Sequence, residues 1–193
     1  MPTPTALLVI DLQRGVVQDC LDRDGVLGRV AKLVDRARTA NVPVIWVQDH
    51  GDFAEGTEAW QLAAPLERRD DEPLVRKEYR DSFVGTDLAE VLEALRVEHL
   101  VVAGAQSDYC IRTTTQAAAA RGLDVTLVSD AHTTTDSEHD GVVITAEQIV
   151  AHTNMYFGGL RYPGRRYATT KHDQVTFEPL QESSGGTSGP SVR

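Results

Sequence analysis

Three residues of complementary chemical types follow three separate apolar runs of this 193-residue chain. Asp11 follows A-L-L-V-I, Lys77 follows L-V-R, and Cys110 follows V-V-A-G-A-Q-S-D-Y. A carboxylate can accept and return a proton, an ammonium group can hold negative charge nearby, and a thiolate is a strong nucleophile. These groups suit acyl transfer through a thioester if the fold brings them together.

The segment around Cys110 predicts a strand, a glycine turn and a helix that begins close to the thiol. A helix start offers unpaired backbone N–H groups and about half a positive charge, both of which favour a thiolate. We therefore expect Cys110 to be a nucleophile, with an oxyanion hole formed by N–H groups at the turn. The alternative is a small buried packing residue, which is how we interpret Cys20.

Along the chain, short apolar runs alternate with segments in which apolar residues recur at helical spacing. This alternation is expected for buried parallel strands and their connecting helices. The predicted strands are 6–10, 42–47, 74–76, 99–103, 124–128 and 166–170, and the predicted helices lie near 26–37, 86–95, 108–121 and 145–157. Thr86 is expected as an N-cap, Gly122 as a left-handed cap, and Thr145 with Gln148 as a capping box. The long polar stretch 49–73 is typical of a functional or disordered loop.

This alternation predicts an α/β fold with three α/β/α layers: a Rossmann-like, doubly wound, mostly parallel sheet of about six strands. Ligands in such sheets bind beyond the carboxyl ends of the strands, so we expect Asp11, Lys77 and Cys110 in one crevice. One domain is expected over residues 1–178, followed by a flexible tail over 179–193 that is rich in serine and glycine.

The formal net charge of -10 argues against nucleic acid and anionic membranes as partners. The sequence has no apolar stretch of membrane-spanning length and no charged leader followed by an apolar run. Only two cysteines are present, which fits a reducing compartment. We expect a cytoplasmic protein that acts on a small molecule.

Five ordered motifs carry a resemblance to a known family: A-L-L-V-I-D-L-Q at 6–13, V-R-K at 75–77, S-F-V-G-T-D-L at 82–88, V-V-A-G-A-Q-S-D-Y-C at 101–110 and V-S-D-A-H at 128–132. The block G-T-E-A-W at 56–60 adds to them. They resemble the isochorismatase-like cysteine hydrolases, which include nicotinamidases, N-carbamoylsarcosine amidases and ureidoacrylate hydrolases. The resemblance spans about residues 6–157.

The resemblance implies an isochorismatase-like hydrolase fold and a catalytic triad of Asp11, Lys77 and Cys110. It also implies a cis peptide between Ala105 and Gln106, with the backbone N–H groups of Gln106 and Cys110 as the oxyanion hole. Family members are often oligomeric, so a homo-oligomer, a dimer or tetramer, is implied as well.

Metal and cofactor sites are not expected. Nicotinamidases have a metal site with an Asp-x-His pair, whereas here Asp49 and His50 are adjacent and Asp52 follows, which favours an ordinary polar loop. The chain reads D-L-Q-R-G after the first strand, where a dinucleotide-binding protein would have G-x-G-x-x-G.

Residues near the predicted crevice are candidates for shaping a substrate pocket. An aromatic pocket would suit a small planar amide, although such residues are often core or contact residues. The candidates are Gln13, Phe53, Trp60, Tyr79, Phe83, Tyr109 and His132. Arg112 is a further candidate for an anionic substrate group, with a solvated helix face as the alternative.

We therefore expect a cysteine-dependent hydrolase that cleaves a C–N bond of a small amide, carbamoyl or ureido compound. Vinyl-ether hydrolysis of the isochorismatase type is an alternative, but it needs a general acid and no sulfur nucleophile. The non-enzymatic alternative is a catalytically silent binding module with the same fold.

Overall fold

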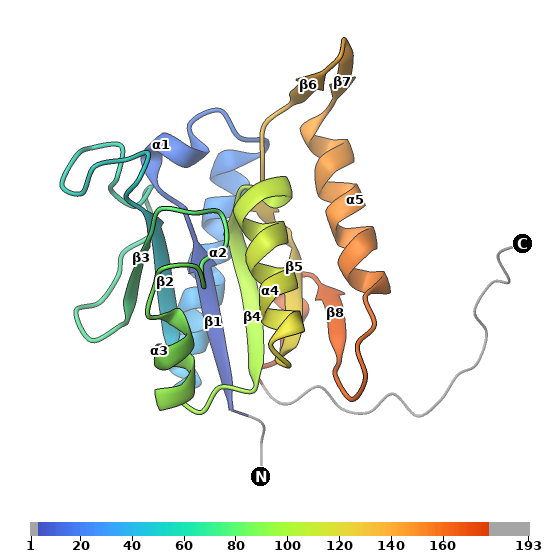
Figure 1. Cartoon of the computed structure of the whole chain (residues 1–193). Coiled ribbons are helices and arrows are strands. Elements are labelled where there is room, and N and C mark those ends of the chain that lie inside the picture. Colours follow the sequence, from blue (N-terminus) through green and yellow to red (C-terminus); the bar gives the residue numbers. More distant parts are fainter. Residues whose placement is uncertain (1–3, 178–193) are drawn as a thin grey trace, which may run out of the picture.

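Six strands form one all-parallel sheet in the computed structural model, which describes residues 4–177 (Figure 1). The sheet order is β3–β2–β1–β4–β5–β8. The strands are β1 (Thr5–Ile10), β2 (Val44–Asp49), β3 (Leu74–Lys77), β4 (His99–Ala105), β5 (Asp124–Thr133) and β8 (Tyr167–Thr170). The predicted α/β fold is confirmed. The sheet was predicted to be mostly parallel, and all of its strand pairings are parallel. The expected tail, 179–193, lies outside the described residues.

Helices cover both faces of this sheet and complete the three layers (Figure 1). One face is covered by α2 (Arg23–Thr39). The other carries α3 (Leu88–Ala94), α4 (Arg112–Ala120) and α5 (Ala146–Gly159). Short helical turns are α1 (Arg14–Val17), η1 (Ser107–Ile111) and η2 (His172–Gln174).

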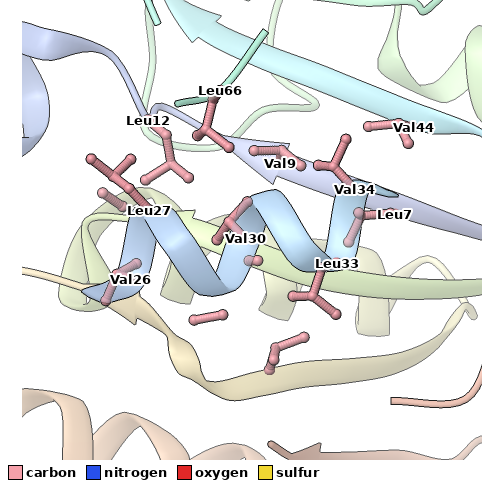
Figure 2. Close-up of a cluster of buried hydrophobic side chains, with 14 of the residues drawn as sticks. Leu7, Val9, Leu12, Val26, Leu27, Val30, Leu33, Val34, Val44 and Leu66 are labelled. Carbon is pink, nitrogen blue, oxygen red and sulfur yellow. The ribbon is translucent and has the colours of Figure 1, made fainter. Parts of the chain in front are cut away.

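The continuous apolar run of β1 is explained by burial on both of its faces. Leu7 and Val9 pack in one core cluster with Val30 and Leu33 of α2 (Figure 2). Alternate residues of the strand, including Leu8, belong to a second cluster beneath α3, α4 and α5. Because successive side chains of a strand point to opposite faces, a strand buried on both sides must be apolar at every position.

The winding of the chain places a switch point between β1 and β4. The chain runs outward from β1 through β2 to β3, then returns to pair β4 on the other side of β1. Helices that follow β1 and β4 leave toward opposite faces, so the carboxyl ends of these two strands flank an open crevice. Asp11 and Cys110 follow those two ends.

Several local predictions are confirmed and others need correction. Thr145 and Gln148 form the predicted capping box, and Gly122 has a left-handed φ of +83°. The helix α3 starts one residue later than predicted, because the Asp87 carbonyl accepts its first backbone hydrogen bond from Val91. The Asp87 side chain makes no cap hydrogen bond, and the hydroxyl of Thr86 accepts the Leu88 N–H at 3.3 Å instead.

A hairpin of β6 (Ser137–His139) and β7 (Val142–Ile144) projects beyond α5 and was not predicted (Figure 1). Its strands have only three residues each, too few to give a periodic signal. Among residues 4–177, no helix combines the length and apolar character needed to cross a membrane.

Candidate active site

Asp11, Lys77 and Cys110 meet at the carboxyl edge of the sheet. The Lys77 Nζ lies 2.7 Å from Asp11 Oδ2 and donates a hydrogen bond to Cys110 Sγ at 3.4 Å. Asp11 and Lys77 are each 1% exposed, whereas the thiol residue is half-buried. A carboxylate and an ammonium group are therefore held together out of water, with the thiol on the side that solvent reaches.

The backbone at the end of β1 turns sharply to present Asp11. Its φ is +50°, a left-handed value that is uncommon outside glycine and tends to occur at functional sites. Beside it, Gly104 of β4 has a φ of +138° and pairs with Ile10. A Cβ at Gly104 would overlap the Ile10 carbonyl oxygen, so only glycine allows this close approach.

A second carboxylate, Asp49, lies beside the lysine. Asp49 ends β2, between β1 and β3, and its Oδ2 is 3.6 Å from Lys77 Nζ. Gln13 fixes it, because the Gln13 amide donates to the Asp49 carbonyl at 2.8 Å and accepts the Asp49 N–H at 2.7 Å. The sequence pattern placed Asp49 in an ordinary polar loop, with a metal ligand as the alternative. The strand-end rule that selected Asp11 would also have found it.

A cavity of about 290 Å³ opens over the thiol, a size suited to a small ligand. Its described lining residues are Asp11, Gly15, Val16, Asp49, Asp52, Phe53, Arg80, Gln106, Tyr109 and Cys110. The peptide bond between Ala105 and Gln106 is cis, at the position that the family resemblance implies.

Two of the predicted pocket residues, Phe53 and Tyr109, line this cavity. Gln13 is fully buried and forms the two hydrogen bonds to the Asp49 backbone described above. Phe83 is buried in the core cluster that lies between the sheet and α3. Trp60 contributes its carbonyl to a hydrogen bond from Gln48. None of these three residues lines the cavity.

His132 also lies outside the cavity, 2% exposed and hydrogen-bonded on both ring nitrogens. Tyr79 is 57% exposed. Arg112 is exposed, with its guanidinium 5.9 Å from the ring centroid of Tyr156, so the solvated helix face is the better description.

Arg80 was missed by the sequence analysis. Its guanidinium lies 3.7 Å from the ring centroid of Tyr109, and both side chains line the cavity. Stacking of this kind is favourable because the aromatic face carries negative charge density. Nothing in the surrounding K-E-Y-R-D indicates the contact, which depends on how the loop after β3 folds over η1.

Burial and the neighbouring charges shift the pKa values of both Asp11 and Lys77. Burial raises the pKa of Asp11 from 3.8 to about 6, although the neighbouring Lys77 charge opposes the change. Burial disfavours the charged form of Lys77, but its interactions with Asp11, Cys110 and Asp49 outweigh this effect and raise that pKa to about 12. At neutral pH the pair is therefore a carboxylate and an ammonium ion.

The prediction of a resting thiolate at Cys110 is wrong for this structure. Burial, followed by the Asp11 charge, raises the pKa of the thiol to about 12, against the opposing effect of Lys77. The helix start does not override the cost of burying a second negative charge beside Asp11. Cys20, by contrast, is buried in the core as predicted.

The segment 49–52 is organised by its own hydrogen bonds. Asp49 Oδ1 accepts the N–H groups of Gly51 at 2.8 Å and Asp52 at 3.0 Å. His50 Nε2 lies 3.8 Å from the Glu78 carboxylate. Within residues 4–177, the side chains form no group of three or more His, Cys, Asp or Glu placed to hold a metal ion. The absence of a catalytic metal stays a prediction.

The fold and the buried cluster define an α/β protein with an acid, a lysine and a thiol gathered at the switch point of its sheet. The family model of the isochorismatase domain matches residues 5–154, and the chain therefore belongs to the isochorismatase family, as its motifs predicted. The Asp11, Lys77 and Cys110 cluster lies within the matched region.

Curated relatives and solved structures agree with this assignment. A streptothricin hydrolase of Streptomyces noursei is 37% identical over 138 residues, covering 68% of this chain and 55% of the relative. The chain thus spans about half the length of that relative. The isochorismatase family protein YddQ of Bacillus subtilis is 32% identical, covering 75% of this chain and 86% of YddQ. An isochorismatase structure from Pseudomonas putida KT2440 superimposes with a TM-score of 0.81 at 26% identity, covering 90% of both chains.

Proposed function

We propose that the protein is a cysteine-dependent amidase that hydrolyses a C–N bond of a small amide, carbamoyl or ureido compound. The carrying observation is the Cys110 thiol at the floor of a small cavity, 3.4 Å from Lys77, which is itself paired with Asp11. Asp11 Oδ1 is buried and has no hydrogen-bond partner among residues 4–177, so a proton acceptor is free beside the nucleophile.

In the first half-reaction, Cys110 Sγ bonds to the substrate carbonyl carbon and its proton passes to Asp11. Because the resting thiol is a weak acid, the proton leaves as the C–S bond forms rather than beforehand. The carbonyl electrons move to oxygen, where the backbone N–H groups of Gln106 and Cys110 would stabilise the oxyanion. Asp11 then protonates the leaving nitrogen, the C–N bond breaks, and a thioester remains.

In the second half-reaction, water attacks the thioester while Asp11 accepts a proton from it. The C–S bond breaks, the acid product leaves, and the proton returns to the sulfur. Lys77 stays protonated throughout, because its pKa is raised to about 12, and it offsets the negative charge that passes between Asp11 and the reacting oxygen and sulfur atoms. A carboxyl pKa near 6 suits this role, since a general base is most effective when its pKa lies near the working pH.

An ammonia-release screen tests the proposal. The panel contains small amides, N-carbamoyl amino acids and ureides. It also includes nicotinamide and streptothricin, because relatives of this chain are named nicotinamidase and streptothricin hydrolase. Each compound is assayed with and without a chelator. Activity is expected with at least one compound class, and the chelator is expected to leave it unchanged.

Replacement of the nucleophile is the decisive arm of this experiment. We expect Cys110→Ala and Cys110→Ser to lower kcat/KM by about a thousandfold or more, since no thioester can form. Mass spectrometry of the wild type during turnover should detect a substrate-derived adduct on Cys110. A Cys20→Ala variant is the matched control and should retain activity. Near-normal turnover by Cys110→Ala would exclude the mechanism.

Vinyl-ether hydrolysis remains the alternative activity, for which Asp11 would act as a general acid without help from the thiol. Turnover of isochorismate that survives Cys110→Ala would favour it. A catalytically silent module would turn over none of these compounds and form no adduct.

A further inference from the structure

A buried polar chain lies behind the nucleophile and plays no part in the steps above. Ser107 Oγ is 2.8 Å from His132 Nδ1, and His132 Nε2 is 3.1 Å from Asn154 Oδ1. Asn154 Nδ2 donates to the Ser129 carbonyl at 2.9 Å. Ser107 is fully buried and His132 is 2% exposed. Buried polar groups with every bond made tend to fix one arrangement of their surroundings.

The order of donors and acceptors along this chain follows from one carbonyl group. The Ser129 oxygen can only accept, so Asn154 must direct its amide nitrogen toward it and its amide oxygen toward His132. His132 Nε2 therefore carries the hydrogen and Nδ1 carries a lone pair. The Ser107 hydroxyl donates to that lone pair.

Burial keeps this imidazole neutral. Desolvation lowers the pKa of His132, so that at neutral pH the ring keeps a single hydrogen. A second hydrogen on Nδ1 would reverse the bond and make the Ser107 hydroxyl the acceptor. At neutral pH the ring is therefore the acceptor for Ser107.

The anchored residue begins the turn that carries the nucleophile. Ser107 is the first residue of η1, and Cys110 is the fourth. The chain at the end of β5 also contacts Asp108, the residue after Ser107. The Thr134 hydroxyl donates to Asp108 Oδ1 at 2.7 Å. His132 and Thr134 are two residues apart, and alternate residues of extended chain point the same way. The end of β5 therefore holds two successive residues of the turn.

We propose that His132, oriented by Asn154, is a positioning residue that fixes η1 so that the Cys110 thiol meets Lys77 and Asp11. Neither His132 nor Ser107 lines the cavity, so both act through the turn rather than on substrate. A shift of η1 would change the Lys77–Cys110 contact of 3.4 Å. A misplacement of about 1 Å can reduce turnover by about a hundredfold.

The test compares two substitutions at one position. The amide of an asparagine lies near Nδ1 of the histidine that it replaces, whereas that of a glutamine lies near Nε2. His132→Asn can still accept the Ser107 hydrogen bond, but His132→Gln loses that acceptor. We expect His132→Gln to lower kcat about tenfold or more with KM within about threefold, and His132→Asn to recover a large part of kcat.

His99→Gln is the matched control. His99 is also buried, at 1% exposure, and bonds Thr5 and Thr126 through its two ring nitrogens. It lies at the start of β4, at the opposite edge of the sheet from the cluster. The same chemical change there should cost stability but leave kcat within about twofold. Ser107→Ala, a smaller deletion, is expected to lower kcat as His132→Gln does and serves if that variant does not fold.

The kinetic arm rests on the proposed function, so a second readout avoids turnover. The rate of Cys110 alkylation by iodoacetamide at pH 8 is followed by mass spectrometry of the Cys110 peptide. A shift of about half a pH unit in the thiol pKa changes this rate about threefold, so a change of about threefold or more is expected in His132→Gln and Ser107→Ala, and none in His99→Gln. If no amide is hydrolysed but the alkylation rate changes, the proposed function fails and the positioning role stands. An alkylation rate and a kcat that match the wild type in both variants would overturn the role.

Discussion

At the scale of single residues, the chemistry depends on burying opposite charges beside a thiol. Lys77 and Asp11 are each almost inaccessible, and burial without a partner would neutralise either of them. Each therefore keeps its charge through the other. In the proposed mechanism the pair gives Cys110 a base and a counter-charge, while burial raises the pKa of the thiol and keeps it protonated at rest.

The pH profile of kcat/KM should report the Asp11 carboxyl. Because Asp11 must be ionised to accept the thiol proton and its pKa is raised to about 6, activity should be lost as pH falls through about 6. Asp11→Asn should lower kcat/KM by about a hundredfold or more and remove this acidic limb. The measurement is kcat/KM between pH 5 and 9 on the best compound of the screen. A profile that stays flat down to pH 5, as an ordinary carboxyl pKa would give, would contradict it.

Arg80 should act on binding rather than on the chemical step. It lines the cavity and stacks 3.7 Å from the Tyr109 ring centroid, whereas the charge beside the thiol comes from Lys77, which contacts Asp11, Asp49 and Cys110. We expect Arg80→Met to raise KM about tenfold with kcat within about threefold. Arg80→Lys keeps the charge but not the flat stack, so it separates the two contributions. A loss confined to kcat would contradict this assignment.

At the scale of elements, the site depends on how closely β4 approaches β1. Gly104 faces the Ile10 carbonyl one residue before Asp11, with no room for a Cβ. We expect Gly104→Ala to lower the free energy of unfolding by about 2 kcal/mol or more, since backbone atoms on both sides must move. Gly28→Ala in α2 is the control, because its Cβ would meet no atom within 4 Å.

That control substitution should be neutral or stabilising by up to about 1 kcal/mol, because alanine favours the helix more than glycine does. Urea unfolding at pH 7 measures both variants. Equal stability of Gly104→Ala and the wild type would mean that the close approach of the two strands is not required.

The elements also show what a sequence can and cannot predict. Asp11, Lys77 and Cys110 were found because each follows an apolar run, and the parallel order of the strands then brings their ends together. Asp49 obeys the same rule. The pocket aromatics could not be sorted this way, since only the path of the loop after β2 decides that Phe53 reaches the cavity and Trp60 does not. The partners of His132 come from η1 and α5, which no local pattern connects.

At the scale of the whole molecule, a buried histidine should make stability depend on acid. Burial lowers the pKa of His99 from 6.5 to about 4. Between these values the unfolded chain binds a proton that the folded chain does not, so the free energy of unfolding falls as pH decreases. From pH 7 to pH 5 this contribution is about 2 kcal/mol.

His99→Gln isolates this contribution from the other titrating groups. The variant should be less stable than the wild type at pH 7, because glutamine cannot reproduce both hydrogen bonds of the His99 ring to Thr5 and Thr126. Between pH 7 and 5, however, it should lose about 2 kcal/mol less stability than the wild type. Urea unfolding at both pH values measures the difference. Parallel losses in the two proteins would show that His99 titrates normally.

The switch point between β1 and β4 has a consequence for how the molecule acquires its activity. The strands that flank it are direct neighbours in the sheet, although β2 and β3 lie between them in the sequence. Contacts between distant parts of a chain need loop closure before they can form, which slows their formation. We therefore expect Cys110 to gain its contacts with Lys77 and Asp11 only when β1 and β4 have paired, so that activity on refolding should follow completion of the sheet.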